Sequence, residues 1–406
     1  MKKIITAIPG PPEAELMPVL SGKKVRTRLQ VKKGLFCILL LIAFLSSRAQ
    51  DDRRPDPSAF KIPVLKAIAY GITAPSPHNT QSWFVDTISG TEMYLYVKNV
   101  LPATDPPARQ IHMGAGCFIE LVAIGMSKEG FETRVEYFPE GEYKIENNMM
   151  ASKPVAKITL VKNPEIQKDI LYDFITQRCT NRKPYDGKMI TPEEFNQIRS
   201  LTGHIHSDMS FITGEAEMKP YLDIFSKGME IETRTTQTNE ETRKMFRFSE
   251  QERQEKKDGL SIPQMGMDGI IRKFAEGSLN HGDSATWHSD KNFKSTMNGI
   301  NKGIYSARGI ILFKTTTNNM LDWVLAGRDY ARYNVAIAKL GLATHPYNQV
   351  LQEYPEMASL QKEFTALTKT GGTEKTQMIV RVGRAKSPYK SWRKNVGDYL
   401  IPKGSK

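Results

Sequence analysis

A loop in the first quarter of the chain carries polar side chains at spacings that suit a flat ligand. It reads Ser76-x-x-Asn79-x-Gln81-x-Trp83, and two prolines restrict its backbone. Backbone N–H groups and side-chain amides that both donate and accept are the groups needed to hold the edge of a heterocycle such as a flavin ring. The alternative interpretation is an ordinary polar turn.

A second segment, Arg178-x-Thr180-x-Arg182, places two guanidinium groups around a hydroxyl. This arrangement is well matched to bidentate contact with a phosphate. The alternative is a solvated helix end.

The pattern of apolar residues predicts elements in irregular order around these two segments. A helix over 63–71 leads into the first loop, and Thr191, Pro192 and Glu194 predict a capped helix start after the second segment. A helix-rich section opens at Pro164. The other predicted elements are helices over 111–128, 320–340 and 356–367 and strands over 93–97, 134–138, 156–161, 309–314 and 377–382. Because strands and helices do not alternate regularly, we expect an α+β fold.

Two of the predicted helices share a pair of small residues, Ala115-Gly116 and Ala326-Gly327. Each helix reaches another glycine fourteen residues after the first and then turns into apolar residues. The match predicts two related halves in one chain.

Residues 230–260 form a strongly polar stretch, broken mainly by Met245, Phe246 and Phe248. This composition predicts an insertion. It is either a solvated surface helix or a lid over a site, since long excursions from a compact domain are often lids.

The net charge of +13 is unevenly distributed. Residues 1–50 hold nine Lys and Arg against two Glu, which leaves +6 for the rest of the chain. A charge of that size suits small anionic ligands, and we expect no nucleic acid partner.

The first 50 residues resemble a targeting segment. A basic cluster precedes an apolar run from Leu35 to Leu45, and Ser47-Arg48-Ala49 supplies small residues before Gln50. We expect residues 1–50 to be a signal peptide region and the product to be exported to the periplasm, with no stable membrane span after removal. A short anchor or a buried helix is the alternative.

The cysteines give no disulfide framework to the exported chain. Cys37 lies inside the apolar run, which leaves Cys117 and Cys179 in the mature chain. The fold must therefore depend on its core.

The sequence gives weaker support to three other kinds of site. Gly282-Asp283-Ser284, with His281 and His288 nearby, is similar to an esterase nucleophile segment but does not follow a strand. His204-x-His206 lacks a third metal ligand, so we expect no metal site. No Gly-x-Gly-x-x-Gly opens a helix after a strand, which argues against a classical dinucleotide-binding dehydrogenase.

Taken together, the motifs resemble the nitroreductase family, and among its members the Acg-type subfamily of large single-chain proteins. The segment from Ala74 to Trp83 is similar to the family's flavin-ring loop, and Arg178 to Tyr185 is similar to its Arg-Ser-x-Arg-Arg phosphate segment. The resemblance spans roughly residues 60–400. Further matches are Leu101-Pro102-Ala103-Thr104-Asp105-Pro106, the two Ala-Gly helices, Phe246-Arg247-Phe248 leading to Asp258-Gly259-Leu260, and Arg381-Val382-Gly383.

The resemblance implies a nitroreductase-like fold with one FMN site between two halves of an internal pseudo-dimer. The first half covers residues 51–163 and the second covers 164–406, including the lid-like insertion. Matching positions assign Ser76, His78, Asn79 and Gln81 to the ring, and Arg178, Thr180 and Arg182 to the phosphate and ribityl chain. The tail residues Lys390 and Arg393 are assigned to the phosphate. Cys179, Asn181 and Ser82 depart from the family pattern.

The implied activity is two-electron transfer from NAD(P)H through FMN to a nitroaromatic or quinone-like acceptor, in a monomer with an internal two-fold. The flavin supplies the chemistry, so no catalytic side chain is assigned. The main alternative is a non-catalytic FMN carrier or storage protein whose lid covers the flavin. A flavin-free binding protein on the same scaffold is a third possibility.

Overall fold

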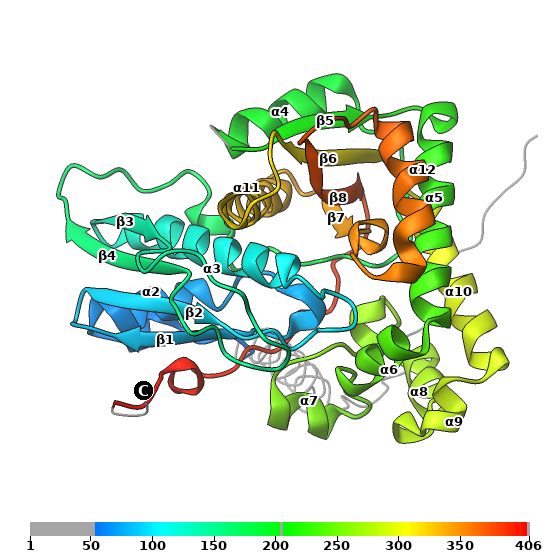
Figure 1. Ribbon diagram of the computed structural model, residues 1–406, viewed down its shortest axis with the longest axis horizontal. Helices are drawn as coiled ribbons and strands as arrows, with labels where there is room; N and C mark the ends of the chain where they lie inside the picture. The colour runs from blue at the N-terminus through cyan, green and yellow to red at the C-terminus, as the bar shows by residue number, and fades with distance from the viewer. Residues whose placement is uncertain (1–52, 204–205, 404–406) are drawn as a thin grey trace, which may run out of the picture. The chain divides into compact units, whose positions relative to one another are not determined.

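The computed structural model describes residues 53–203 and 206–403 of the 406-residue chain. The predicted signal region, with Cys37, and His204 lie outside the described residues. The part of the chain from Arg53 onward forms one compact unit of α+β class, with two four-stranded antiparallel sheets (Figure 1).

The first sheet has the strand order β1-β2-β4-β3. Its inward positions alternate along the strands, and Val85 of β1 pairs with Leu95 of β2. The elements of this half are α2 (Pro63–Gly71), β1 (Trp83–Thr87), β2 (Glu92–Val97), α3 (Arg109–Lys128), β3 (Phe131–Tyr137) and β4 (Ala156–Lys162). The predicted helix over 63–71 and the predicted strands of this half are thus confirmed.

The second sheet has the equivalent order β5-β6-β8-β7. In both halves a helix precedes two strands, a 20-residue helix follows them, and two further strands complete the sheet. The elements of this half are α4 (Pro192–Thr202), β5 (Asp208–Ile212), β6 (Gly309–Thr315), α11 (Met320–Lys339), β7 (Ala343–Pro346), α12 (Ala358–Thr368) and β8 (Lys375–Gly383).

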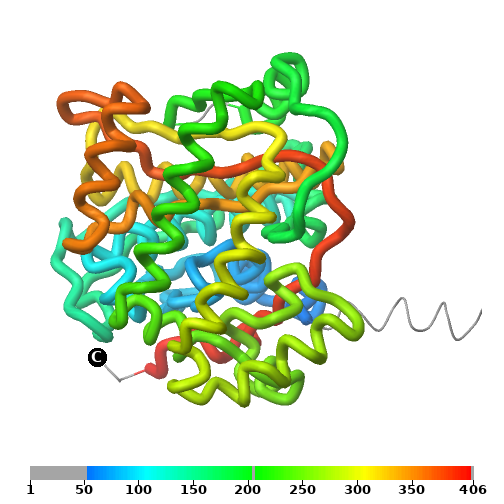
Figure 2. The backbone as a smooth tube through the Cα atoms, turned by 90° about the vertical axis from the view of Figure 1, so that its right-hand side faces the viewer, coloured from blue at the N-terminus to red at the C-terminus, as the bar shows by residue number. Residues whose placement is uncertain are grey.

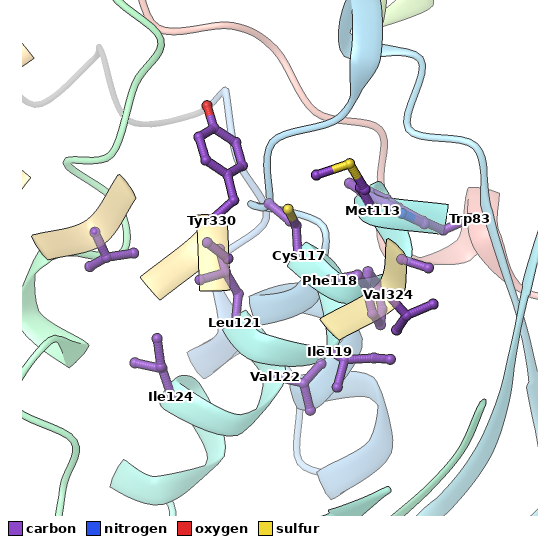
Figure 3. Packing of buried hydrophobic residues seen from close by; sticks show 14 of the residues in the cluster. Trp83, Met113, Cys117, Phe118, Ile119, Leu121, Val122, Ile124, Val324 and Tyr330 are labelled. Atoms are coloured by element: carbon purple, nitrogen blue, oxygen red, sulfur yellow. The ribbon is translucent and has the colours of Figure 1, made fainter. Parts of the chain in front are cut away.

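Helices α3 and α11 pack directly against each other between the sheets (Figures 1 and 3). A Cβ added to Gly116 would lie 1.8 Å from the carbonyl oxygen of Val324, and one added to Gly327 would lie 2.0 Å from that of Met113. Each glycine therefore lies against a backbone carbonyl of the other helix, and that carbonyl belongs to the residue three positions before the other glycine. The predicted Ala-Gly repeat thus has a physical basis, because only glycine allows the backbones to approach this closely.

Helix α3 is long and apolar enough to span a membrane, but 89% of its apolar window is buried inside the protein. Its side chains pack against α2, α11 and the first sheet. It is the central core helix of this fold.

The second half carries a long excursion between β5 and β6. Figure 2 shows it from green to yellow. The predicted insertion over 230–260 is the most polar part of this excursion. The helices at its two ends bury apolar faces through Phe225 and Ile304, so their composition did not mark them as part of an insertion. Its helices are α5 (Glu215–Arg234), α6 (Thr236–Lys244), α7 (Glu250–Lys256), α8 (Gly269–Ser278), α9 (Ser284–Trp287) and α10 (Asp290–Ile304).

The capped start of α4 was predicted correctly, but the prediction that a helix-rich section opens at Pro164 was wrong. Thr191 Oγ1 accepts from Glu194 N, and Glu194 Oε2 accepts from Thr191 N, which confirms the capping box. Between Pro164 and Ile190, however, regular structure is limited to a 3₁₀ turn at Tyr172–Phe174. The backbone here bonds to distant strands instead, as when Asn181 N donates to Thr344 O at 2.9 Å.

Candidate functional site

The predicted ring loop has an unusual backbone. His78, Asn79 and Gln81 have φ values of 47°, 55° and 52°. A non-glycine residue in this left-handed region costs roughly 1–3 kcal/mol, so the surrounding contacts must hold the loop. One contact is internal, because Gln81 N donates to Ser76 Oγ at 3.1 Å.

The two amide side chains of the loop are bonded within the protein. Asn79 Nδ2 donates to Gly259 O at 3.2 Å, and Gln81 Nε2 donates to Lys257 O at 2.8 Å. Gln81 Oε1 accepts from Tyr399 Oη at 2.6 Å. These amides fasten the loop to the end of the polar insertion and to the C-terminal tail. Their direct contact with a ring stays a prediction.

Arg393, predicted to bind phosphate, also holds the loop. It is 4% exposed; its Nε donates to Ile72 O at 2.9 Å and its Nη1 donates to Asn79 Oδ1 at 2.6 Å. Nη2 donates to Ala74 O at 3.1 Å. Lys390 is half-buried, and its carbonyl accepts from Arg53 Nη1 at 3.0 Å. The tail therefore positions the loop through its backbone and Arg393.

Arg178 lies buried behind the ring loop. Its Nη2 donates to Thr73 O at 3.2 Å, whereas its Nε has no hydrogen-bond partner. Arg54 Nη2 donates to Arg178 O at 3.2 Å, and Arg54 Nε is likewise buried without a partner. Burial lowers the pKa of Arg178, and the nearby charge of Arg54 lowers it further.

Arg182 lies on the other side of half-buried Thr180 in the chain. Burial lowers its pKa, and its Nη1 makes a long contact of 3.5 Å with Gln264 O. Within the described part of the chain, no carboxylate forms an ion pair with the site arginines Arg54, Arg178, Arg182 and Arg393. Arg178 and Arg393 are buried, and Arg54 and Arg182 are half-buried. Cations withdrawn from water without a counter-ion are unfavourable, so this cluster is suited to an anionic ligand.

Further buried polar atoms near these arginines also lack partners. Burial, followed by the charge of Arg182, lowers the pKa of His78 to about 4, so its imidazole is neutral at pH 7; its Nδ1 has no partner. His345 Nδ1 on β7 is also unpartnered, and burial and the charge of Arg182 lower its pKa. Oδ1 and Nδ2 of Asn334 on α11 are buried, and the neighbour that affects them is Tyr330, whose pKa the amide lowers; neither atom reaches a partner with full hydrogen-bond geometry. Native proteins rarely leave so many buried polar atoms without partners.

Tyr330 on helix α11 lies between these unpartnered polar groups and the arginines. It precedes Asn334 by one helical turn. Tyr330 is buried and lies near both Arg178 and Arg182, and Figure 3 shows it beside Cys117 of α3. Both Cys117 and Cys179 are free thiols. The site thus takes residues from both halves of the chain.

Sequence reasoning missed Arg54, His345, Tyr330 and Asn334. The available signal was weak. Arg54 sits in a basic pair just after the predicted cleavage point, and Asn334 is a polar residue on an otherwise apolar helix face.

The end of the polar insertion and the residues directly after it cover the ring loop. Gly259 N donates to Asn79 O at 3.1 Å, and Gln264 Nε2 donates to Ser391 Oγ at 2.7 Å. Asp258 accepts from Arg247 at 2.6 Å and from Lys394 at 3.1 Å. The covering segment, residues 257–266, therefore joins the loop, the tail and the insertion.

For the esterase and metal-binding interpretations considered from the sequence, the described residues form no assembled site. His206 Nε2 lies 2.8 Å from Asp322 Oδ1, and the described residues contain no cluster of three metal-ligating side chains. Asp283 caps α9 by accepting from Thr286 N at 2.9 Å, and His288 bonds Glu240. Two surface hollows, one lined by residues that include Asn196, Arg199 and Met209 and one by residues that include Ala358 and Lys375, contain none of the predicted site residues.

Comparison with known proteins gives a weak structural likeness. No family model and no curated protein matches the chain. Among solved structures it is similar to a nitroreductase-like family protein from Bacillus cereus, with 12% identity over 58% of this chain and 96% of that one, and a TM-score of 0.33. It is also similar to the FMN-dependent nitroreductase NfnB from Mycobacterium smegmatis in complex with NADPH (13% identity, 57% and 92% covered, TM-score 0.32). A third similar structure is a nitroreductase with bound FMN from Bacteroides fragilis, with 13% identity over 58% of this chain and 97% of that one, and a TM-score of 0.29.

Proposed function

We propose that this chain is an FMN-dependent oxidoreductase of nitroreductase type, which holds one flavin between two related halves that act as an internal pseudo-dimer. The observation that carries the proposal is the cluster of buried Arg178 and half-buried Arg182, which has no carboxylate partner among the described residues. The equivalent strand orders of the two sheets and the reciprocal glycine contacts support the pseudo-dimer.

The residues present fit an FMN group. In the proposal Arg178, Arg54 and Arg182 hold the phosphate, with Thr180 beside them. The neutral imidazole of His78 and the amide of Asn334 can each donate or accept, which suits a ring edge. Asn79 and Gln81 keep the ring loop in its left-handed conformation.

Bound FMN would supply two-electron chemistry, accepting hydride from NAD(P)H and passing electrons to a nitroaromatic or quinone-like acceptor. The protein's own contribution is positional. Buried cations favour the phosphate, and the two halves bury the flavin between them. We further propose that residues 1–50 direct export to the periplasm and that the mature chain is a monomer.

One observation favours a second candidate, an FMN carrier. Residues 257–266 are hydrogen-bonded across the ring loop, which would keep substrates from a flavin held there.

The two candidates differ when the loaded protein meets a reductant. We expect protein purified from residue 51 onward and loaded with FMN to lose its visible flavin absorbance rapidly when NADH or NADPH is added anaerobically. Bound flavin that stays oxidised would instead support the carrier, and absence of bound flavin would overturn both.

A further inference from the structure

Glu232, near the C-terminal end of α5, is a buried carboxylate without a cationic partner. It is 6% exposed, and no donor reaches its Oε2 with full hydrogen-bond geometry. Burial raises its pKa to about 7; the side-chain amides of Gln352 and Gln349 lower it, and the charge of Glu241 on α6 raises it further. Within residues 53–203 and 206–403, no lysine, arginine or histidine forms an ion pair with Glu232. A carboxylate withdrawn from water in this way is unfavourable unless a cation reaches it.

The loop between β7 and α12 packs against α5 beside this carboxylate. A Cβ added to Gly228, one helical turn before Glu232, would lie 3.2 Å from Cβ of Gln349. The buried guanidinium of Arg109 also reaches this loop, but its Nη2 donates to the carbonyl oxygen of Leu351 at 2.9 Å. Arg109 therefore holds the loop backbone and leaves Glu232 unmatched.

Three further buried oxygen atoms of this loop have no hydrogen-bond partner. They are Oε1 of Gln349, Oε1 of Gln352 and Oη of Tyr354. Gln352 and Tyr354 are each 6% exposed. Both amides lie against the Glu232 carboxylate. Burial raises the pKa of Tyr354 and the charge of Glu232 raises it further, so the phenol also lies close to the carboxylate. One carboxylate, two amides and one phenol thus meet where α5 packs against the loop.

The unpartnered atoms at this junction differ in kind from those of the arginine cluster. Around the arginines they are mainly nitrogens, namely Nε of Arg54 and Arg178 and Nδ1 of His78 and His345. At Glu232 and the loop they are all oxygens. Carboxylate, amide carbonyl and hydroxyl oxygens are the ligands that hard cations prefer. A half-turn of either amide would bring its oxygen, in place of its nitrogen, to the carboxylate.

The charge of this set of ligands favours a monovalent cation. Glu232 supplies one negative charge, and the amides and the phenol are neutral. Glu241 is bonded elsewhere, because its carboxylate accepts from Ala103 N and from Thr104 N at 2.9 Å each. An alkali-metal cation would therefore neutralise the site, whereas a divalent cation would leave a buried positive charge.

We propose that the four oxygen-bearing side chains at this junction bind an alkali-metal cation, which joins α5 to the loop between β7 and α12. The ligands are Glu232, Gln349, Gln352 and Tyr354. The site has one acidic ligand and so differs from a group of three His, Cys, Asp or Glu side chains, which the described residues do not form. The proposal goes beyond the flavin function and does not depend on it.

Thermal unfolding in different chloride salts, followed by circular dichroism, tests the proposal on the chain from Asp51 onward. The salts are NaCl, KCl and tetramethylammonium chloride at equal ionic strength and pH 8. A cation that binds only the folded chain stabilises it, so we expect the unfolding midpoint in about 100 mM NaCl or KCl to exceed that in tetramethylammonium chloride by at least about 3 °C.

Two variants should lose this difference between salts. E232Q removes the charge and Y354F removes one ligand oxygen, and both keep the size of the side chain. We expect E232Q to abolish the difference and Y354F to reduce it to about half or less. The matched control is E356Q, which removes an exposed carboxylate from the same loop and should keep the full difference.

Three outcomes would overturn the cation site. The unmodified chain could unfold at the same midpoint in all three salts, which would exclude a specific cation. E232Q or Y354F could keep the full difference, which would place the cation elsewhere; Y354F decides this if E232Q does not fold. Stabilisation by CaCl2 without any by NaCl or KCl would contradict the monovalent assignment.

Discussion

Replacement of both Arg178 and Arg182 by alanine is expected to weaken FMN binding by roughly 100-fold or more. Hydrogen bonds from charged donors contribute about 1.5–3 kcal/mol each, so two arginines account for about 3–6 kcal/mol of binding free energy. Arg199→Ala is the matched control, because Arg199 is exposed on α4 outside the cluster. Flavin fluorescence titration of each variant measures the effect.

The same double variant should keep its stability without flavin. Neither guanidinium group forms an ion pair with a carboxylate of residues 53–203 or 206–403, and burial lowers the pKa of both, so their removal takes away a desolvation cost. We expect an unfolding midpoint in urea close to that of the unmodified chain. Unchanged FMN affinity in the double variant would refute the assignment of these arginines to the phosphate. Loss of FMN binding together with loss of the folded state would also contradict it, because the arginines would then be needed for folding.

Gly327→Val is expected to lower the free energy of unfolding by at least about 3 kcal/mol, the upper end of the range for overpacking. An added Cβ would lie 2.0 Å from the carbonyl oxygen of Met113, and both atoms belong to helices that cannot move apart without opening the core. Gly116→Val should cost a similar amount, because its Cβ would lie 1.8 Å from Val324 O. Urea unfolding followed by circular dichroism measures both.

Gly299→Ala on α10 is the control for the glycine variants. No atom lies within 4 Å of its added Cβ, so this change should be neutral or stabilising by up to about 1 kcal/mol. If Gly327→Val unfolds at the same urea concentration as the unmodified chain, α3 and α11 do not cross as closely as described. The reciprocal glycine contacts would then no longer support the pseudo-dimer.

Local signals in the sequence predicted much of the fold. The helix of residues 63–71, the capping box at Thr191 and the core helices α3 and α11 depend on residues within a few positions of one another. The Ala-Gly repeat was also visible, since both helices meet the same packing requirement at their crossing.

The candidate site was less predictable because its contacts join distant segments. The hydrogen bond from Arg393 to Asn79 links residues 314 positions apart, and nothing near either residue indicates it. The unpartnered atoms of His345 and Asn334 lie on β7 and α11, more than 150 positions after Arg178 and Arg182, so only the folded chain brings them near these arginines. The motif around Arg178 could be proposed from the sequence because its spacing is local, and its contact with a phosphate stays a prediction.

The comparison of FMN with riboflavin tests the central claim most directly, because the two ligands differ only by the phosphate. The unmodified chain from residue 51 onward is titrated with each, and flavin fluorescence gives the two dissociation constants. A phosphate held by the buried arginines predicts a constant for FMN at least roughly 100-fold below that for riboflavin. Equal affinities, or no binding of either ligand, would contradict the account.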